Sequence, residues 1–138
     1  MTSETNLPTL LRNLRPALQE EAFGFFSLAE AAALPLLPEA RGCFREEEGL
    51  TLILPVETAV AQGLTPEAEW ALITLTVYSS LTAVGFLAAI SAALAAAGIS
   101  LNAVSACYHD HLFVPWDRRH EALGILEGLA GESPSKTP

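Results

Sequence analysis

Three consecutive polar residues, His109, Asp110 and His111, form the most conspicuous group in the sequence that could bind an ion. Two histidines separated by one residue share a face of a strand, and two imidazoles with a carboxylate are ligands that a divalent metal accepts. Two-ligand patterns are unspecific, and Asp110 equally suits a polar turn in which its side chain bonds to its own backbone. We therefore expect a turn between two strands and no metal or other cofactor, with metal binding as the third of three functions.

A pair of serines, Ser79 and Ser80, is the second feature that could do chemistry. Either hydroxyl can accept a hydrogen bond from a backbone N–H in the first turn of a helix that follows. The free N–H groups and the positive end of the dipole at such a helix start favour a carboxylate. Helix capping alone also explains these residue types, so the sequence leaves both interpretations open.

The element that must position these residues is a run without Asp, Glu, Lys or Arg from Trp70 to Tyr108. It predicts a strand in WALITLTV, a helix from the serine pair to Gly98, and a second strand in ISLNAVSACY, which together make a βαβ unit. The predicted helix carries a stripe of large apolar residues on one side and a stripe of small residues on another, here called the large stripe and the small stripe. The large stripe is Leu87, Ile90 and Leu94, and the small stripe is Gly85, Ala89, Ala93 and Ala96. We expect the large stripe to lie on the sheet and the small stripe to admit a second helix, from this chain or from another subunit.

An apolar run of this length also resembles a transmembrane segment. Hydroxyl and amide side chains interrupt it, much of the rest is alanine, and Gly98 divides it. No Lys or Arg lies close to either end to set an orientation in a membrane. We therefore expect a buried core and no membrane association.

Charge and composition exclude some partners. Seven basic and sixteen acidic residues give the 138-residue chain a formal charge of −9, so it lacks the clustered Lys and Arg that nucleic acid requires. The N-terminal residues lack the basic start and apolar core of a signal peptide, so cytoplasmic residence is the default expectation. Cys43 and Cys107 show no CxxC spacing. They could form one disulfide, but without export features we expect both to be free, buried thiols.

The flanking segments repeat one order of elements. Asn6 is a predicted cap for a short helix with Pro8 in its first turn, and a strand is expected at residues 23–28. A hairpin with Gly49 at its turn and a helix from Pro55 to about Gln62 follow. After the turn at YHDH come the strand LFVP and a helix from about residue 116 to 131. The repetition of two strands and a helix predicts two similar halves.

At residue level, the segment 73–115 resembles the ACT domain. The resemblance is carried by S-S-L, A-x-x-GIS-x-N and YHDHLFVP, and in the first half by GLTLILP. The whole chain is similar to a bacterial family of short tandem-ACT proteins of unassigned function. The resemblance implies an α+β fold: a ferredoxin-like tandem repeat with antiparallel or mixed sheets and helices packed on one face. It places the halves at residues 1–65 and 66–131, followed by a disordered tail at 132–138, and implies a homodimer.

The resemblance also implies a function. ACT domains bind amino acids where the loop after the first strand meets the first helix, which in this chain gives the residues Val77, Tyr78, Ser79, Ser80 and Leu81, with Asn102 on the following strand. The expected function is a regulatory or sensor module that binds a small molecule, an amino acid, without catalysis. The alternative is a structural or partner-binding dimerisation module with no small ligand. The sequence shows no nucleophile motif, phosphate-binding glycine loop or HExxH motif that would indicate an enzyme.

Overall fold

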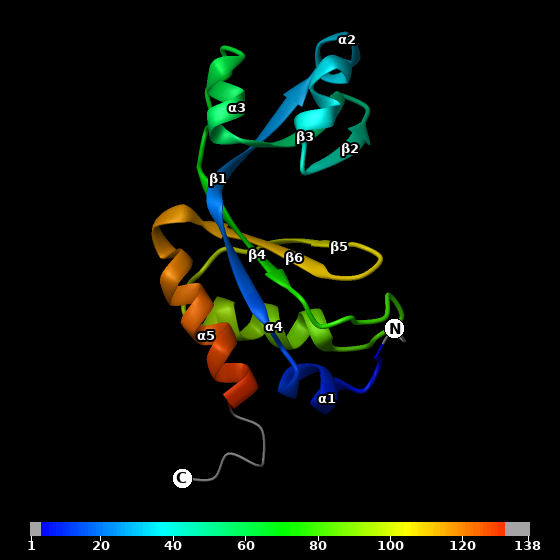
Figure 1. The fold of residues 1–138 in the computed structure, drawn as a ribbon, viewed down its shortest axis with the longest axis vertical. Helices are drawn as coiled ribbons and strands as arrows, with labels where there is room; N and C mark the ends of the chain where they lie inside the picture. The colour runs from blue at the N-terminus through cyan, green and yellow to red at the C-terminus, as the bar shows by residue number, and fades with distance from the viewer. Residues whose placement is uncertain (1–3, 132–138) are drawn as a thin grey trace. The chain divides into compact units, whose positions relative to one another are not determined.

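The computed structural model describes residues 4–131, and the structural statements below concern those residues. The described residues divide into two compact units, a larger unit made of residues 4–19 with 71–131 and an inserted unit, Glu20–Trp70. Strand β1, Pro16–Leu28, leads from the larger unit into the inserted one, and β4, Trp70–Leu75, leads back (Figure 1). Residues 4–19 therefore belong to the same compact unit as the second half of the chain.

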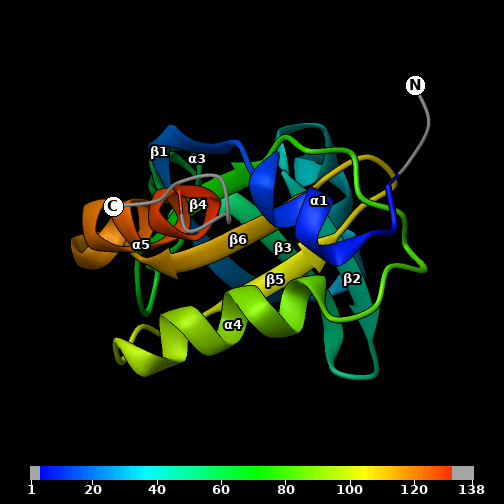
Figure 2. The same cartoon turned by 90° about the horizontal axis from the view of Figure 1, so that it is seen from below.

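The larger unit contains the elements that surround the candidate site. After α1, Leu7–Arg12, and the start of β1, it continues from β4 to α4, Phe86–Ala96, β5, Asn102–Ser105, and β6, Asp110–Pro115. A short 3₁₀ turn, η2, Trp116–Arg118, leads into α5, Arg119–Gly131. Strand β6 lies between β4 and β5, which makes the split βαβ arrangement of a ferredoxin-like fold. Figure 2 shows α4 and α5 beside the strands β5 and β6.

The core of the larger unit forms between the strands and the three helices. Alternate residues of a strand point to opposite faces, so Ala71, Ile73 and Leu75 of β4 contribute to one apolar layer. Ile90 and Leu94 of the large stripe on α4 are fully buried in the same layer, whereas its third member, Leu87, is half-buried. The remaining buried members of this core are Leu10, Leu14, Phe86, Ile99, Leu112, Val114, Ala122 and Leu126.

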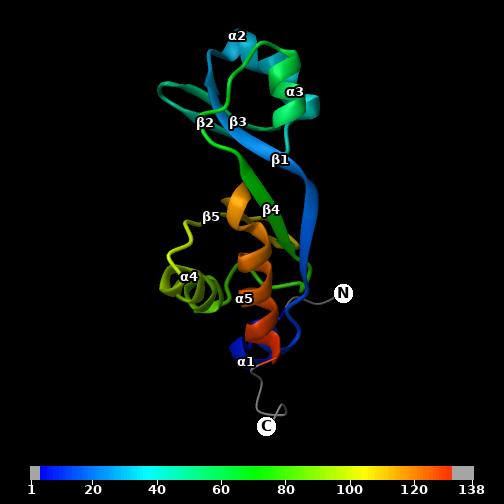
Figure 3. The same cartoon turned by 90° about the vertical axis from the view of Figure 1, so that its left-hand side faces the viewer.

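The inserted unit has the same order of elements in shorter form. After β1 come α2, Glu30–Ala33, the 3₁₀ helix η1, Leu34–Glu39, the hairpin strands β2, Gly42–Glu46, and β3, Gly49–Pro55, and α3, Val56–Ala61. Strand β3 lies between β2 and β1 and pairs antiparallel with both. The helices α2 and α3 lie on one side of β2 and β3 (Figure 3) and enclose a small core around Leu52, Leu54 and Ala59.

Several local predictions are confirmed. Asn6 caps α1 by accepting the Thr9 N–H at 3.0 Å, and Gly98, with φ 72°, follows the end of α4. Gly49 has φ 148° and begins β3, where a Cβ atom would lie 2.5 Å from the carbonyl oxygen of Leu28. The α+β, ferredoxin-like fold class is confirmed. The predicted halves, 1–65 and 66–131, are divided at one point according to the repeat of elements in the sequence. The compact units are defined by packing instead, so residues 4–19 are grouped with the second half and the inserted unit is Glu20–Trp70.

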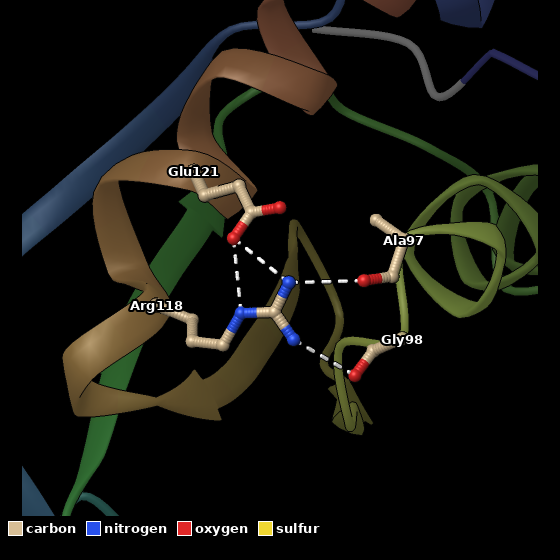
Figure 4. A network of polar contacts seen from close by, with 4 residues as sticks. All are labelled: Ala97, Gly98, Arg118 and Glu121. Carbon is tan, nitrogen blue, oxygen red and sulfur yellow. Dashed lines mark hydrogen bonds and ion pairs between the residues drawn. The ribbon is translucent and has the colours of Figure 1, made fainter.

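Arg118 ties the end of α4 to the start of α5. Its guanidinium donates to the backbone carbonyls of Ala97 at 2.9 Å and Gly98 at 3.0 Å, and twice to the carboxylate of Glu121 (Figure 4). The last carbonyls of a helix have no partners inside the helix, so a planar cation with several donors is well suited to bind them. This contact holds α4 in place from the end opposite to the candidate site.

Two further expectations concern membranes and cysteines. Within residues 4–131 no helix combines the length and apolar character that crossing a membrane requires. Cys43 and Cys107 are free but exposed, so the expectation of buried thiols is wrong. Cys43 lies on β2, whose residues after Gly42 are all exposed, and Cys107 lies in the turn before β6. The predicted disordered tail at 132–138 lies outside the described residues.

Candidate functional site

A buried carboxylate stands at the centre of the candidate site. Asp110 is the first residue of β6 and is 6% exposed. One of its oxygens accepts the hydroxyl of Ser79 at 2.9 Å, and the other accepts the hydroxyl of Ser105 at 2.5 Å. Ser105 faces Asp110 directly across the antiparallel pair β5–β6. Two hydroxyl donors thus compensate part of the cost of burying the carboxylate.

The loop between β4 and α4 carries Ser79 to this carboxylate. Ser79 is 7% exposed, whereas its neighbour Ser80 turns its hydroxyl to Thr82, 2.8 Å away, and accepts the Thr82 N–H. The Ala83 N–H donates to the Ser80 carbonyl and closes a turn. The two serines therefore have different roles, one in a buried hydrogen bond with Asp110 and one within the loop.

The predicted helix start at Ser79 or Ser80 is wrong. Helix α4 begins at Phe86, and its N-cap is Gly85, with a left-handed φ of 88°. The hydroxyl of Ser79 donates to Asp110 and so does not cap a helix, and the backbone N–H of Ser80 donates to the Glu4 carbonyl. Among the described residues no side chain caps the N–H groups at the start of α4.

A small pocket of about 70 Å³ lies between this loop, the start of α4 and the carboxylate. Its size is well below the roughly 300–1,000 Å³ of pockets that enclose a drug-sized ligand. It therefore suits a very small ligand or the polar end of a larger one. The lining residues are Ser79, Ser80, Leu81, Ala83, Phe86, Leu87, Ser105 and Asp110.

Three of the six predicted ligand-binding residues, Ser79, Ser80 and Leu81, line the pocket, and the other three lie elsewhere. Val77 packs against the core, and the ring of Tyr78 contacts that of Tyr108 in a tilted arrangement, with the centroids 5.1 Å apart and an interplanar angle of 44°. Asn102 is exposed at the start of β5, opposite Phe113.

The three polar residues at the start of β6 point to separate partners. The Nδ1 atom of His109 lies 3.4 Å from the carbonyl oxygen of Val77, and that of His111 lies 3.0 Å from the Thr74 hydroxyl. In the described part of the chain no group of three acidic, histidine or cysteine side chains is placed to hold a metal ion.

Sequence reasoning did not predict that Asp110 lines the pocket. It also did not predict that Ser105 and the start of α4 line it. Asp110 was assigned to a turn, but it occupies the first position of β6. A carboxylate two residues before the apolar run LFVP, with only His111 between them, is the one local signal that it enters a buried strand. The pairing with Ser79 has no local signal, because the two residues are 31 positions apart.

The inserted unit has a larger hollow of different character. It measures about 270 Å³ and is lined almost entirely by apolar side chains, with Gln62 as its polar member. Its walls are the end of β1, the helical segment 32–36 and the chain after α3. It holds no charged group comparable to Asp110.

Comparison with known proteins supports the assignment of both halves. One model of the ACT domain matches residues 2–71, and a second matches residues 67–128. A Vibrio cholerae protein of unknown function, described as a possible transport protein, is 40% identical, with 90% of this chain and 95% of that chain covered and a TM-score of 0.80. No match was found among curated proteins.

More distant structures share the fold. The regulatory subunit of aspartate kinase from Thermus thermophilus, in its ligand-free form, has a TM-score of 0.62 at 12% identity, covering 83% of this chain and 95% of that chain. A protein from Agrobacterium tumefaciens has a TM-score of 0.65 at 16% identity, covering 85% and 89%. At such identities the likeness shows the fold alone.

Proposed function

Because the chain belongs to the ACT-domain family, we propose that it is a regulatory module that binds a small amino acid, without catalysis, at the pocket beside Asp110. The observation that carries the proposal is a buried carboxylate in the wall of a pocket that also reaches the uncapped start of a helix. These two features place a negative side chain and the positive end of a helix dipole in the wall of the same pocket, as a zwitterion requires.

The carboxylate of Asp110 is the proposed partner for the ligand's ammonium group. Among the described residues, the ion pairs formed by arginine side chains involve Glu21, Glu30 and Glu121, and none of them involves Asp110. A buried charge is costly when it has hydrogen bonds but no counter-ion. A ligand ammonium would supply that counter-ion and a charge-assisted hydrogen bond.

The start of α4 is the proposed partner for the ligand's carboxylate. The first N–H groups of a helix have no partner inside the helix, and the helix dipole favours negative charge there. Gly85 has no side chain with which to cap them, and Phe86 and Leu87 line the pocket. We expect the ligand's side chain to point outward past Leu81, which is 65% exposed, because the pocket itself is small.

The test is a thermal-shift panel of the twenty amino acids against the wild type, Asp110→Asn and Asp117→Asn. A ligand that binds only the native state raises the free energy of unfolding, by about 2.7 kcal/mol when its concentration is 100 times Kd, and so raises the melting temperature. We expect one or a few amino acids to stabilise the wild type and Asp117→Asn, in which the exposed acid of η2 is changed. Asp110→Asn should lose the shift while remaining folded, because both serine hydroxyls can rotate to suit an amide.

Two outcomes would contradict this proposal. If no amino acid raises the melting temperature, the alternative of a dimerisation or partner-binding module without a small ligand is favoured. If an amino acid stabilises Asp110→Asn as much as the wild type, the ligand binds elsewhere in the protein.

We also propose that the chain forms a homodimer through the edge strand β5. All four residues of β5 are exposed, Val104 is 44% exposed, and the segment from Ile99 to Cys107 carries no charge. An uncharged edge strand is a template for pairing with a second copy. Ala89 and Ala93 of the small stripe on α4 are half-buried within the chain, so that stripe is a weaker candidate for the interface.

A further inference from the structure

The loop that carries Ser79 is held by a backbone contact with the N-terminal segment. The Glu4 N–H donates to the Tyr78 carbonyl at 3.0 Å, and the Ser80 N–H donates to the Glu4 carbonyl at 2.9 Å. Together these bonds form an isolated parallel bridge between Glu4 and Ser79. The residues on both sides of Ser79 are therefore fixed by one residue that lies far away in the sequence.

The side chain of Glu4 anchors this contact to the rest of the unit. Its Oε1 atom accepts the N–H groups of Thr5 at 3.0 Å and Asn6 at 2.9 Å. Asn6 in turn caps α1, in which Leu10 is fully buried in the core. Glu4 thus connects a helix packed in the core to the loop that forms one wall of the pocket.

We propose that Glu4 is a positioning residue: its two backbone hydrogen bonds with Tyr78 and Ser80, here called the strap, hold the loop 78–80 in the conformation that forms the pocket. The inference rests on the proposed function, because it concerns ligand binding at the same site. The strap aligns the Ser79 hydroxyl with Asp110 and holds Ser80 in the pocket wall. The strap and the ligand favour the same conformation of the loop. The strap should therefore raise the affinity for the ligand, and bound ligand should raise the equilibrium constant for forming the strap by the same factor.

The first test compares Glu4→Pro with Thr5→Pro by amide hydrogen exchange of the free protein. Proline at position 4 removes the N–H that binds the Tyr78 carbonyl. Proline at position 5 removes only a local bond to the Glu4 side chain and favours the extended backbone that residue 4 needs. We expect the Ser80 amide to exchange about tenfold faster in Glu4→Pro, a change of ~1.4 kcal/mol, and to be little altered in Thr5→Pro.

The second test measures ligand affinity with whichever amino acid raises the melting temperature of the wild type. Glu4→Pro should weaken its binding about tenfold while Thr5→Pro keeps it. Glu4→Gln should bind as the wild type does because its amide oxygen can accept the same two N–H groups, whereas Glu4→Ala should bind more weakly. A merely structural role would lower the melting temperature of Glu4→Pro and leave affinity unchanged.

The two tests separate failure of the strap from failure of the proposed function. Equal exchange at Ser80 in the two proline variants would overturn the strap, whether or not any amino acid binds. Faster exchange in Glu4→Pro with undiminished affinity would overturn its role in positioning the site. If the wild type binds none of the twenty amino acids, the proposed function fails, and the exchange result alone decides whether Glu4 holds the loop.

Discussion

Replacing Ser79 by alanine should destabilise the protein far more than replacing its neighbour Ser80. The Ser79 hydroxyl donates at 2.9 Å to the carboxylate of Asp110, and both side chains are more than nine-tenths buried. A hydrogen bond to a charged group contributes about 1.5–3 kcal/mol. The Ser80 hydroxyl pairs with Thr82 in an exposed loop, so Ser80→Ala should cost less than about 0.5 kcal/mol.

The assay is thermal and urea unfolding of the two single variants. For a chain of this size a loss of about 2 kcal/mol corresponds to a decrease in Tm of roughly 5–10 °C. We expect that decrease for Ser79→Ala and almost none for Ser80→Ala. An intermediate effect is expected for Ser105→Ala, because Ser105 itself is exposed and water can replace its hydroxyl.

A double-mutant cycle tests the stated cause of the effect. In an Asp110→Asn background the partner is neutral, so Ser79→Ala should cost at least about 1 kcal/mol less than it does in the wild type. The reasoning is refuted if Ser80→Ala is as destabilising as Ser79→Ala. It is also refuted if the cost of Ser79→Ala is the same in both backgrounds, since the hydroxyl would then not act through the carboxylate.

Three other predictions test the fold and the proposed interface. Gly49→Ala should destabilise the protein by about 2 kcal/mol or more, because the new Cβ would collide with a backbone carbonyl. Gly124→Ala in α5 has open space around it and should stabilise the protein by about 0.5–1 kcal/mol. Urea unfolding measures both changes. Arg118→Ala should lower the free energy of unfolding by about 1–2 kcal/mol. Arg118→Lys should recover little of this loss, because an ammonium group cannot reproduce the planar guanidinium with its several donors. If both variants are as stable as the wild type, this prediction is wrong. Val104→Lys should give monomers by size-exclusion chromatography with light scattering while Ala92→Lys on the exposed side of α4 leaves the dimer, and the opposite pattern would place the interface on the helix.

Features that depend on neighbouring residues were predictable from the sequence. Asn6 lies three residues before the N–H that it accepts, so the cap of α1 needs no tertiary information. Gly98 follows an alanine-rich helical run, and a glycine there predicts the left-handed residue that ends α4. The strand at Trp70–Leu75 follows from its apolar, β-branched composition.

The candidate site was only partly predictable, since a serine before an apolar helical run satisfies the pattern of a cap whether or not it is used as one. The loop after β4 was expected to bind a ligand, and three of its residues line the pocket, but the start of α4 was placed too early. Gly85 inside the run was treated as part of a small stripe, although its left-handed conformation marks the helix start.

By itself, the sequence determined the order of strands and helices and most helix ends, because these follow from residue types at spacings of a few positions. Its resemblance to the ACT domain implied the tandem repeat. Only the tertiary structure decided that the Ser79 hydroxyl meets Asp110, that Glu4 straps the loop between them, and that residues 4–19 pack with the second half. The physical reason is that a hydroxyl forms its bond with whichever acceptor the folded backbone brings close. For Ser79 that acceptor lies on another strand, 31 residues along the chain.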